Sequence, residues 1–443
     1  MDSKKKIGVI SLGCDKNRVD SERALYIASK NYEITNDLDE ANVVVINTCA
    51  FLESSRIESL DTVFDCNKKR SKNLEKIVLT GCMPEKFVNE IFDDLVEVDV
   101  FLGILDYDLL IEALDLAYQG NRVNFVNKSN KIIEKNRILT TPCHYYYLRI
   151  ADGCNNKCTY CLIPSIRGKY RSVPIEELIS EVKGLGEAKE IILVAQDVTR
   201  YGIDIYNEPS LVKLIKELSK LEEVGSIRLL YAYPDMITSE LISEIKNNPK
   251  VIKYLDIPLQ HASNGVLKLM NRKGTFDSYL KLISDLKNAI PTISIRSTFI
   301  TGFPSESKKD FKTLCNFIKK AKFTNCGFFA YSREEGTPAY KLPNQISEGV
   351  KEKRVKKLYK IQSKISYNYT KSLVGKTIKV LCDGVDYDMQ SFYGRGYFSA
   401  PEIDGKIYFN SNDVINQGEY YDVLITKATK YDLYGSVKNE FTK

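Results

Sequence analysis

Six apolar, strand-like runs alternate with helix-length segments between residues 145 and 332, and this alternation predicts a parallel βα architecture. The runs are YYYLRIA, EIILVAQDV, SIRLLYAYP, KYLDIPLQ, ISIRSTFITGF and NCGFFAYS. Six βα repeats are too few for the closed eight-stranded barrel. We therefore predict a partial parallel barrel whose active site lies at the carboxyl ends of its strands.

Different patterns flank this barrel, so the predicted fold class is α/β with three folded parts. Residues 1–125 alternate the runs KKIGVISLGC, ANVVVINTC and EKIVLTGC with helical stretches, which indicates a parallel sheet of the flavodoxin type. From residue 372 onward, short runs such as KTIKVLC and GKIYFN indicate a small antiparallel β-barrel. We expect the following division: N-terminal domain 1–125, polar linker 126–142, partial barrel 143–349, basic connector helix 350–371 and β-barrel 372–443.

The first strand of the partial barrel is followed by GCNNKCTYC, which contains Cys154, Cys158 and Cys161. Three thiolates can hold three irons of a 4Fe–4S cluster and leave the fourth iron open. A zinc site would need a fourth Cys or His, and the nearest candidates, Cys143 and His144, lie upstream. The spacing predicts a cluster with one open iron; the alternative is three cysteines that fall together by chance in one loop.

A second set of three cysteines belongs to the N-terminal domain. Cys14, Cys49 and Cys82 each follow a predicted parallel strand, and the carboxyl ends of such strands meet at one edge of the sheet. We therefore predict a second cluster with an open iron. Cys66 does not follow a strand and is left out. The alternative is that these thiols are buried as small apolar groups.

Polar residues at or near the ends of the barrel strands are candidate contacts for a cofactor. The six candidates are Gln196, Asp197, Gln260, His261, Arg296 and Thr298. The alternative for each is an ordinary cap or turn. The chain has only two histidines, which argues against a His-dependent catalytic triad and against a His-rich metal site.

The net charge of +6 is concentrated on one segment. Residues 350–371 carry a net +7, and their apolar residues recur at helical spacing: Val355, Leu358, Ile361, Ile365 and Tyr369. This segment is either a solvated connector helix or a stripe that binds RNA. Residues 372–443 carry eight basic and ten acidic side chains, a net −2, and such an acidic barrel favours a basic protein over a nucleic acid.

Cysteine usage and hydropathy indicate a soluble protein of the cytoplasm. Eleven cysteines without a signal peptide fit a reducing compartment. No apolar run approaches the roughly 18 residues of a membrane span, so we expect no membrane partner.

The motif GCNNKCTYC resembles the signature of the radical S-adenosylmethionine superfamily, and the whole chain resembles the methylthiotransferases within it. SLGCDKNRVDSE, NTCAFLESSRIES, ADGCNNKCTYCLIPSIRGKYRS, YLDIPLQHAS and APEIDG are similar to the RimO branch, which modifies an aspartate of ribosomal protein S-twelve. The resemblance implies that the cysteines at 154, 158 and 161 hold the cluster that cleaves S-adenosylmethionine to a 5′-deoxyadenosyl radical. Tyr160 takes the place of the aromatic residue of the superfamily motif and is a seventh candidate cofactor contact.

The resemblance further implies that Cys14, Cys49 and Cys82 hold an auxiliary cluster whose open iron carries the sulfur to be inserted. The expected cofactors are two 4Fe–4S clusters, S-adenosylmethionine, sulfide or persulfide as sulfur source, and an external electron donor such as flavodoxin or ferredoxin. The expected protein is a monomer whose substrate is S-twelve, within the small ribosomal subunit or free, and the C-terminal barrel resembles a TRAM domain.

Two other functions compete with this interpretation. The MiaB branch of the methylthiotransferases acts on isopentenyl-adenosine of tRNA, and the basic segment keeps it as an alternative. The second alternative is a non-catalytic iron–sulfur protein that carries electrons or binds RNA. A pure electron carrier has no use for an open iron, which argues against this alternative.

Overall fold

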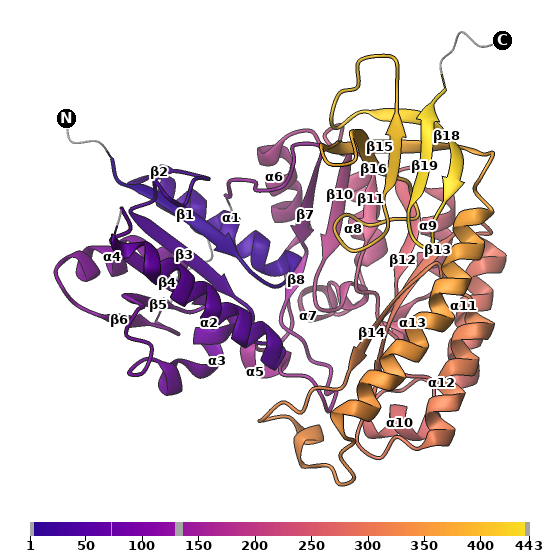
Figure 1. Cartoon of the computed structure of the whole chain (residues 1–443), viewed down its shortest axis with the longest axis horizontal. Helices are drawn as coiled ribbons and strands as arrows, with labels where there is room; N and C mark the ends of the chain where they lie inside the picture. The colour runs from indigo at the N-terminus through magenta and orange to yellow at the C-terminus, as the bar shows by residue number, and fades with distance from the viewer. Residues whose placement is uncertain (1–3, 72, 129–135, 439–443) are drawn as a thin grey trace. The chain divides into compact units, whose positions relative to one another are not determined.

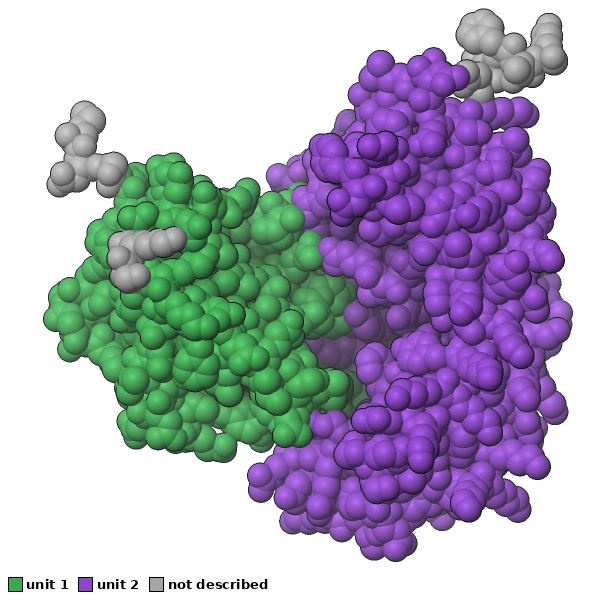
Figure 2. Space-filling view, in the orientation of Figure 1, with its two compact units in different colours: residues 1–140, 147–156, 161–171 green, residues 141–146, 157–160, 172–443 purple. Residues whose placement is uncertain are grey.

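The computed structural model describes residues 4–71, 73–128 and 136–438, and the chain divides into two compact units. Unit 1 comprises residues 1–140, 147–156 and 161–171, and unit 2 comprises residues 141–146, 157–160 and 172–443 (Figure 2). None of the helices in the described ranges is long and apolar enough to cross a membrane.

Unit 1 is built on a six-stranded parallel sheet with the order β2-β1-β3-β4-β5-β6 (Figure 1). Its strands are β1 Lys6–Ser11, β2 Glu33–Ile34, β3 Val43–Thr48, β4 Lys76–Gly81, β5 Val100–Leu102 and β6 Val123–Phe125. This order has the flavodoxin-like 2-1-3-4-5 arrangement with one more strand at its end. The prediction of a flavodoxin-like domain is therefore confirmed.

Helices follow the strands of unit 1, as the crossovers of a parallel sheet require. They are α1 Asp15–Ser29, α2 Glu53–Asn67, α3 Cys82–Ile91, α4 Leu110–Tyr118 and the short α5 Ile163–Ile166. Two apolar clusters hold the layers together, one of them joining α1 and α4 to the sheet. The central strand β3 is buried at every residue, which explains its continuous apolar run.

Unit 2 contains the predicted partial barrel, a sheet with the order β14-β13-β12-β11-β10-β7. Its strands are β7 Tyr145–Arg149, which begins in unit 2, β10 Glu190–Val194, β11 Ile227–Leu229, β12 Val251–Asp256, β13 Ser294–Thr301 and β14 Asn325–Ala330. All six predicted strands are present. The pairings from β10 to β14 are parallel, as expected for successive βα repeats.

The helices of unit 2 lie between these strands in the chain. They are α6 Ile175–Leu185, α7 Ile203–Tyr206, α8 Leu211–Ser219, α9 Ser239–Asn247, α10 Asn264–Leu269, α11 Phe276–Ala289 and α12 Lys308–Ala321. Helices α11 and α12 begin with full capping boxes, at Thr275 and Ser307 respectively, and this local signal defines their first turns.

The C-terminal part of unit 2 is a closed five-stranded barrel with the order β15-β16-β17-β19-β18. Its strands are β15 Thr377–Asp386, β16 Ser391–Arg395, β17 Ile407–Asn410, β18 Tyr420–Ala428 and β19 Leu433–Val437. The predicted small barrel is confirmed. One of its pairings, between β17 and β19, is parallel, whereas the others are antiparallel.

The basic segment forms the helix α13 Glu348–Lys371, which packs against α12 and β14 (Figure 1). The predicted helix is present, and most of its fully buried positions are polar. The buried positions are Lys351, Arg354, Leu358, Gln362, Ser366 and Thr370, and of the five predicted apolar residues only Leu358 is among them. The reason is that backbone carbonyls at the ends of neighbouring elements accept hydrogen bonds from the polar side chains, as Phe323 does from Gln362 and Thr324 from Ser366.

The predicted domain boundaries at 125, 142, 349 and 371 stay predictions. Residues 129–135 of the predicted linker 126–142 lie outside the described residues.

Candidate iron–sulfur sites

Three cysteines of unit 1 stand at the carboxyl ends of neighbouring parallel strands. Cys14 precedes α1 and follows β1, Cys49 follows β3, and Cys82 follows β4 as the first residue of α3. Strands β1, β3 and β4 are adjacent in the sheet. Cys14 is exposed, Cys49 is partly buried and Cys82 is buried. The fold thus brings these three residues to one sheet edge.

Asn17, on the first turn of α1, lies between two of these thiols. Its Oδ1 accepts from Cys14 Sγ and from Cys82 Sγ, each at 3.8 Å. Its Nδ2 donates to the carbonyls of Leu12 and Thr48, at 3.0 and 2.9 Å, and these carbonyls belong to the ends of the β1 and β3 segments. Asn17 therefore fixes the strand ends that carry the cysteines.

Gly13 explains how Cys49 reaches the same place. A Cβ atom at residue 13 would lie 2.7 Å from Cys49 Cβ and 3.2 Å from its Sγ, and the φ angle of Gly13 is +90°. Only a glycine tolerates both this backbone conformation and this close approach. The loop after β1 and the end of β3 therefore touch at the cysteines.

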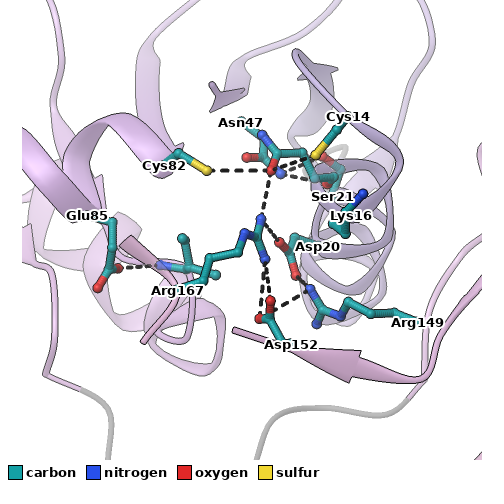
Figure 3. Close-up of polar contacts among 12 residues, drawn as sticks. Cys14, Lys16, Asp20, Ser21, Asn47, Cys82, Glu85, Arg149, Asp152 and Arg167 are labelled. Carbon is teal, nitrogen blue, oxygen red and sulfur yellow. Dashed lines mark hydrogen bonds and ion pairs between the residues drawn. The ribbon is translucent and has the colours of Figure 1, made fainter. Parts of the chain in front are cut away.

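A buried ionic network lies beside these thiols (Figure 3). Arg167 Nη2 donates to Asn17 Oδ1 at 2.7 Å and to Asp20 Oδ2 at 2.9 Å, and Arg167 Nη1 contacts both oxygens of Asp152 at 3.2 Å. Arg149 forms a second ion pair with Asp20. The side chain of Arg167 is 1% exposed. Its charge is thus stabilised by two carboxylates and by the same Asn17 that contacts the thiols.

Burial and Arg167 act on the thiols in opposite directions. Burial raises the pKa of Cys82 to about 12, and the neighbouring Arg167 guanidinium lowers it in part. Burial likewise raises the pKa of Cys49. A thiolate is the form that binds metal, so the cationic Arg167 favours the form that a cluster needs.

The cysteines of the GCNNKCTYC loop are divided between the units, and two belong to unit 1. Cys154 Sγ accepts from the backbone N–H of Asn156, and Cys161 Sγ accepts from that of Ile163, each at 3.4 Å. Gly153, with a φ of +75°, shapes the start of the loop, since an added Cβ would lie 2.2 Å from the carbonyl oxygen of Lys169. Backbone N–H groups directed at sulfur stabilise cluster thiolates.

Cys158 belongs to unit 2, where an aromatic ring and a cation surround it. Its Sγ lies 3.8 Å from Tyr233 Oη and 4.0 Å from Arg272 Nη1. The Arg272 guanidinium also stacks 4.1 Å from the centroid of the Tyr233 ring. Arg272 thus brings a positive charge next to this cysteine.

The donor atoms of both cysteine triads are sulfurs, the ligands that iron–sulfur clusters take. Within the ranges that the structure describes, no group of three or more His, Cys, Asp or Glu side chains is arranged to hold a metal ion. A 4Fe–4S cluster is a larger body held by thiolates alone, and its chemistry depends on charges and N–H groups near the sulfurs. The donor set of the two cysteine triads suits such a group.

The seven candidate cofactor contacts all belong to unit 2 and differ in their surroundings. Gln260 and Thr298 are joined, because the Gln260 N–H donates to the Thr298 carbonyl at 2.8 Å. Arg296 Nη1 donates to Thr298 Oγ1 at 3.3 Å. His261 is completely buried, accepts from the Ser263 N–H at Nδ1, and has its pKa lowered to about 3 by burial.

The remaining candidates are held by their own local contacts. Asp197 caps the turn that follows β10 by accepting from Thr199 N at 3.1 Å. Gln196 precedes it and is partly buried. Tyr160 packs in an apolar cluster with its ring 6.5 Å from that of Phe303. A cofactor role for all seven stays a prediction.

Four polar residues beside the thiols were missed by the sequence analysis: Asn17, Arg167, Tyr233 and Arg272. Asn17 stands three residues after Cys14, a helical step that places both on one side of the first turn of α1. Arg167 belongs to the quoted motif IPSIRGKYRS, to which no role was given. Tyr233 and Arg272 are brought to Cys158 only by the tertiary fold.

Three family profiles match the chain in series. The profile "Uncharacterized protein family UPF0004" matches residues 6–103, "Radical SAM superfamily" matches residues 148–318, and "TRAM domain" matches residues 374–437. The fold resembles the structure of the radical S-adenosylmethionine methyltransferase TsrM from Kitasatospora setae, with a TM-score of 0.53, 11% sequence identity, and coverage of 84% of this chain and 79% of that chain.

Curated relatives match from end to end. The proteins named "Ribosomal protein uS12 methylthiotransferase RimO" from Clostridium tetani and Clostridium kluyveri are 46% and 47% identical, over 100% and 99% of this chain and 100% of each relative. The protein of the same name from Acetivibrio thermocellus is 44% identical over 99% of this chain and 100% of its own length. The chain therefore belongs to the RimO family of radical S-adenosylmethionine methylthiotransferases.

Proposed function

We propose that this enzyme adds a methylthio group to the β-carbon of an aspartate in ribosomal protein uS12. The observation that carries the proposal is the full-length likeness to relatives named for that activity. The acidic C-terminal barrel supports it, because its net charge of −2 favours encounter with a basic ribosomal protein. A tRNA methylthiotransferase is the alternative.

The two cysteine triads are proposed to hold one 4Fe–4S cluster each. When bound, the clusters and S-adenosylmethionine supply the radical chemistry and the sulfur, which side chains cannot provide. Asn17 holds the ends of the β1 and β3 segments in place, and Arg167 supplies a positive charge that stabilises thiolates at Cys49 and Cys82. Arg272 places a positive charge 4.0 Å from Cys158 Sγ.

The candidates near the barrel strand ends are proposed to bind and orient S-adenosylmethionine. Thr298 and Gln260 stand on neighbouring strand segments. Arg296 contacts Thr298 Oγ1 and forms ion pairs with Asp256 at 3.6 Å and with Asp404 at 3.3 Å. The neutral imidazole of His261 keeps its Nδ1 as an acceptor, which fixes the turn after Gln260. A fixed turn limits the motion of the side chains that precede and follow it.

Iron stoichiometry tests the cluster assignment without activity. Replacing Cys154, Cys158 and Cys161 by Ala should remove half of the iron of the anaerobically reconstituted protein. Replacing Cys66, which is buried in the core of unit 1, by Ala is the matched control and should leave the iron unchanged. An unchanged iron content in the triple variant, or its complete loss from a folded protein, contradicts the assignment.

Two substrates distinguish the proposed function from its alternative. The reduced, reconstituted enzyme is offered a peptide of the aspartate loop of uS12 or an isopentenyl-adenosine anticodon stem-loop. Mass spectrometry should find the methylthio group on the peptide only. Modification of the RNA alone would overturn the proposal.

The cellular context is part of the same proposal. All eleven cysteines are free, which fits the reducing cytoplasm. We propose that a flavodoxin or ferredoxin delivers the electrons, that sulfide or persulfide supplies the sulfur, and that the enzyme works as a monomer. Turnover is measured with purified flavodoxin or ferredoxin and its reductase, and failure with both donors contradicts the proposed electron source. The mass in solution is measured by light scattering, and a stable dimer contradicts the proposed monomer.

A further inference from the structure

A groove runs along the outer side of α13, next to the C-terminal end of α12. It encloses a cavity of about 640 Å³ within unit 2. The lining residues are Lys319, Lys322, Phe323, Thr324, Lys357, Lys360, Ile361, Lys364, Ile365, Asn368 and Tyr369. A second hollow of about 460 Å³ shares Lys319 and adds Lys320 and Phe276. We call the larger of these two hollows the lysine groove; the two share only Lys319.

The charge of the lysine groove is not neutralised. Five of the residues that line the larger hollow are lysines, and no acidic residue lines it. Across the described ranges, none of these five ammonium groups forms an ion pair, whereas Lys220, just after α8, is paired with Glu217 at 2.8 Å. Like charges held close together repel, so an anion that binds between them stabilises the protein.

The lysines are not needed to hold α13 in place. The helix is fastened by polar side chains on its other side, including Lys351, whose Nζ donates to the Tyr331 carbonyl at 2.8 Å, and Thr370, whose hydroxyl donates to the Thr429 carbonyl at 2.7 Å. The exposed lysines at 357, 360 and 364 point away from these contacts. A purely structural role therefore does not explain them.

The floor of the groove is apolar. Ile361, Ile365 and Tyr369, which are partly buried, line it. Phe323, which is completely buried, closes the bottom. Positive charge above an apolar and aromatic floor is the arrangement used for the backbone of a nucleic acid, whose sugars and bases need apolar contact and whose phosphates need cations.

We propose that the lysine groove binds the phosphodiester backbone of RNA without reading its sequence. Five lysines line the groove, more than a single phosphate needs, and lysines suit phosphates as point charges. A carboxylate ligand would favour the bidentate fork of arginine, and no arginine lines either hollow. The choice of RNA as the polyanion rests on the proposed function, because a ribosomal protein substrate is bordered by RNA.

The test compares two triple variants of the full-length protein that change the net charge equally. Lys357→Gln, Lys360→Gln and Lys364→Gln together alter the groove, and Lys213→Gln, Lys216→Gln and Lys220→Gln alter exposed lysines on or next to α8. Fluorescence anisotropy with a short labelled RNA is measured over a range of salt concentrations. The groove variant should lose about two units of the slope of log K against log salt, and the α8 variant should keep the slope of the unaltered protein.

Several results would overturn the proposal. If the two variants bind RNA with the same affinity and the same salt dependence, the groove is not the RNA-binding site. Vesicles that contain anionic lipid and an acidic peptide are tested in the same way. If the unaltered protein binds one of these but not RNA, and the groove variant loses that binding, the groove belongs to a different partner.

The same variants keep this proposal separate from the function of the enzyme. Both should modify the free uS12 peptide at the rate of the unaltered protein, while the groove variant should modify assembled small subunits more slowly. If no protein modifies the peptide, the proposed function fails and the RNA-binding result still decides the role of the groove. Equal rates on assembled subunits contradict a role of the groove in docking.

Discussion

Replacing Arg167 by Met tests whether the buried ionic network holds the auxiliary cysteine site. The substitution keeps much of the apolar volume and removes the hydrogen bonds to Asn17, Asp20 and Asp152. Asp20 and Asp152 then lose a buried partner, while Arg149 still pairs with Asp20. Removing one partner of a buried ion pair lowers the free energy of unfolding by about 3–5 kcal/mol. Because Arg149 still pairs with Asp20, we expect a loss of about 3 kcal/mol, at the lower end of this range.

The measurement must report on one part of the molecule, because a chain with two compact units does not unfold in one step. Hydrogen exchange with mass spectrometry on the metal-free protein gives the opening free energy of peptides from α1. A loss of about 3 kcal/mol speeds exchange there by roughly 100-fold. The iron bound by the site of Cys14, Cys49 and Cys82 should fall in parallel.

Arg171→Met is the matched control. Arg171 also lies near Asp152, at 3.9 Å, but its side chain is 44% exposed, so its loss should cost about 0.5 kcal/mol or less. Adding Asp152→Asn to Arg167→Met should recover part of the stability, since the second change removes a buried carboxylate that has lost its nearest arginine and keeps the longer contacts to Arg149 and Arg171. Equal exchange in the Arg167 and Arg171 variants would refute the reasoning.

Three further predictions concern other parts of the chain. His261→Asn should remove an acid sensitivity of the partial parallel barrel. Burial lowers the pKa of His261 to about 3, so below about pH 6.5 the unfolded chain binds a proton that the native protein does not bind. The free energy of unfolding of the unaltered protein should therefore fall by about 2 kcal/mol between pH 7 and pH 5. Hydrogen exchange of barrel peptides at the two pH values measures this, and an equal loss in the variant contradicts it. Gly153→Ala should lower iron binding at Cys154, because the added Cβ lies 2.2 Å from the Lys169 carbonyl oxygen and the backbone conformation costs about 1 kcal/mol or more for alanine; iron equal to that of the unaltered protein argues against this contact. Cys158→Ala should form S-adenosylhomocysteine but no 5′-deoxyadenosine, measured by liquid chromatography, and loss of both products with an intact auxiliary cluster contradicts the division of roles.

The strands could be predicted because local physics decides them. Continuous apolar runs such as that of β3 belong to strands covered on both faces, and the alternation with helices leaves a parallel sheet as the arrangement with short, right-handed crossovers. The position of Cys14, Cys49 and Cys82 at one sheet edge follows from the same rule, since it depends only on where each strand ends.

The surroundings of the cysteines could not be predicted in this way. Arg167 meets Asn17 across 150 positions of the chain, and Arg272 meets Cys158 across 114. No local periodicity relates residues that are so far apart, and their contact depends on how the loops after the strands fold back. A charged residue in a loop has the same local sequence signal whether it is buried beside a thiol or exposed to water.

Helix α13 is a case in which the sequence predicts the element but not the side of it that is buried. Its helical state was evident from the spacing of Leu358, Ile361 and Ile365, but the side that it buries was not. A hydrophobic pattern identifies the side that avoids water in isolation, whereas the fold presents α13 with open carbonyls that accept hydrogen bonds from Gln362 and Ser366. Buried polar atoms must be hydrogen-bonded, so the positions of these acceptors decided the orientation and left the apolar side lining the lysine groove.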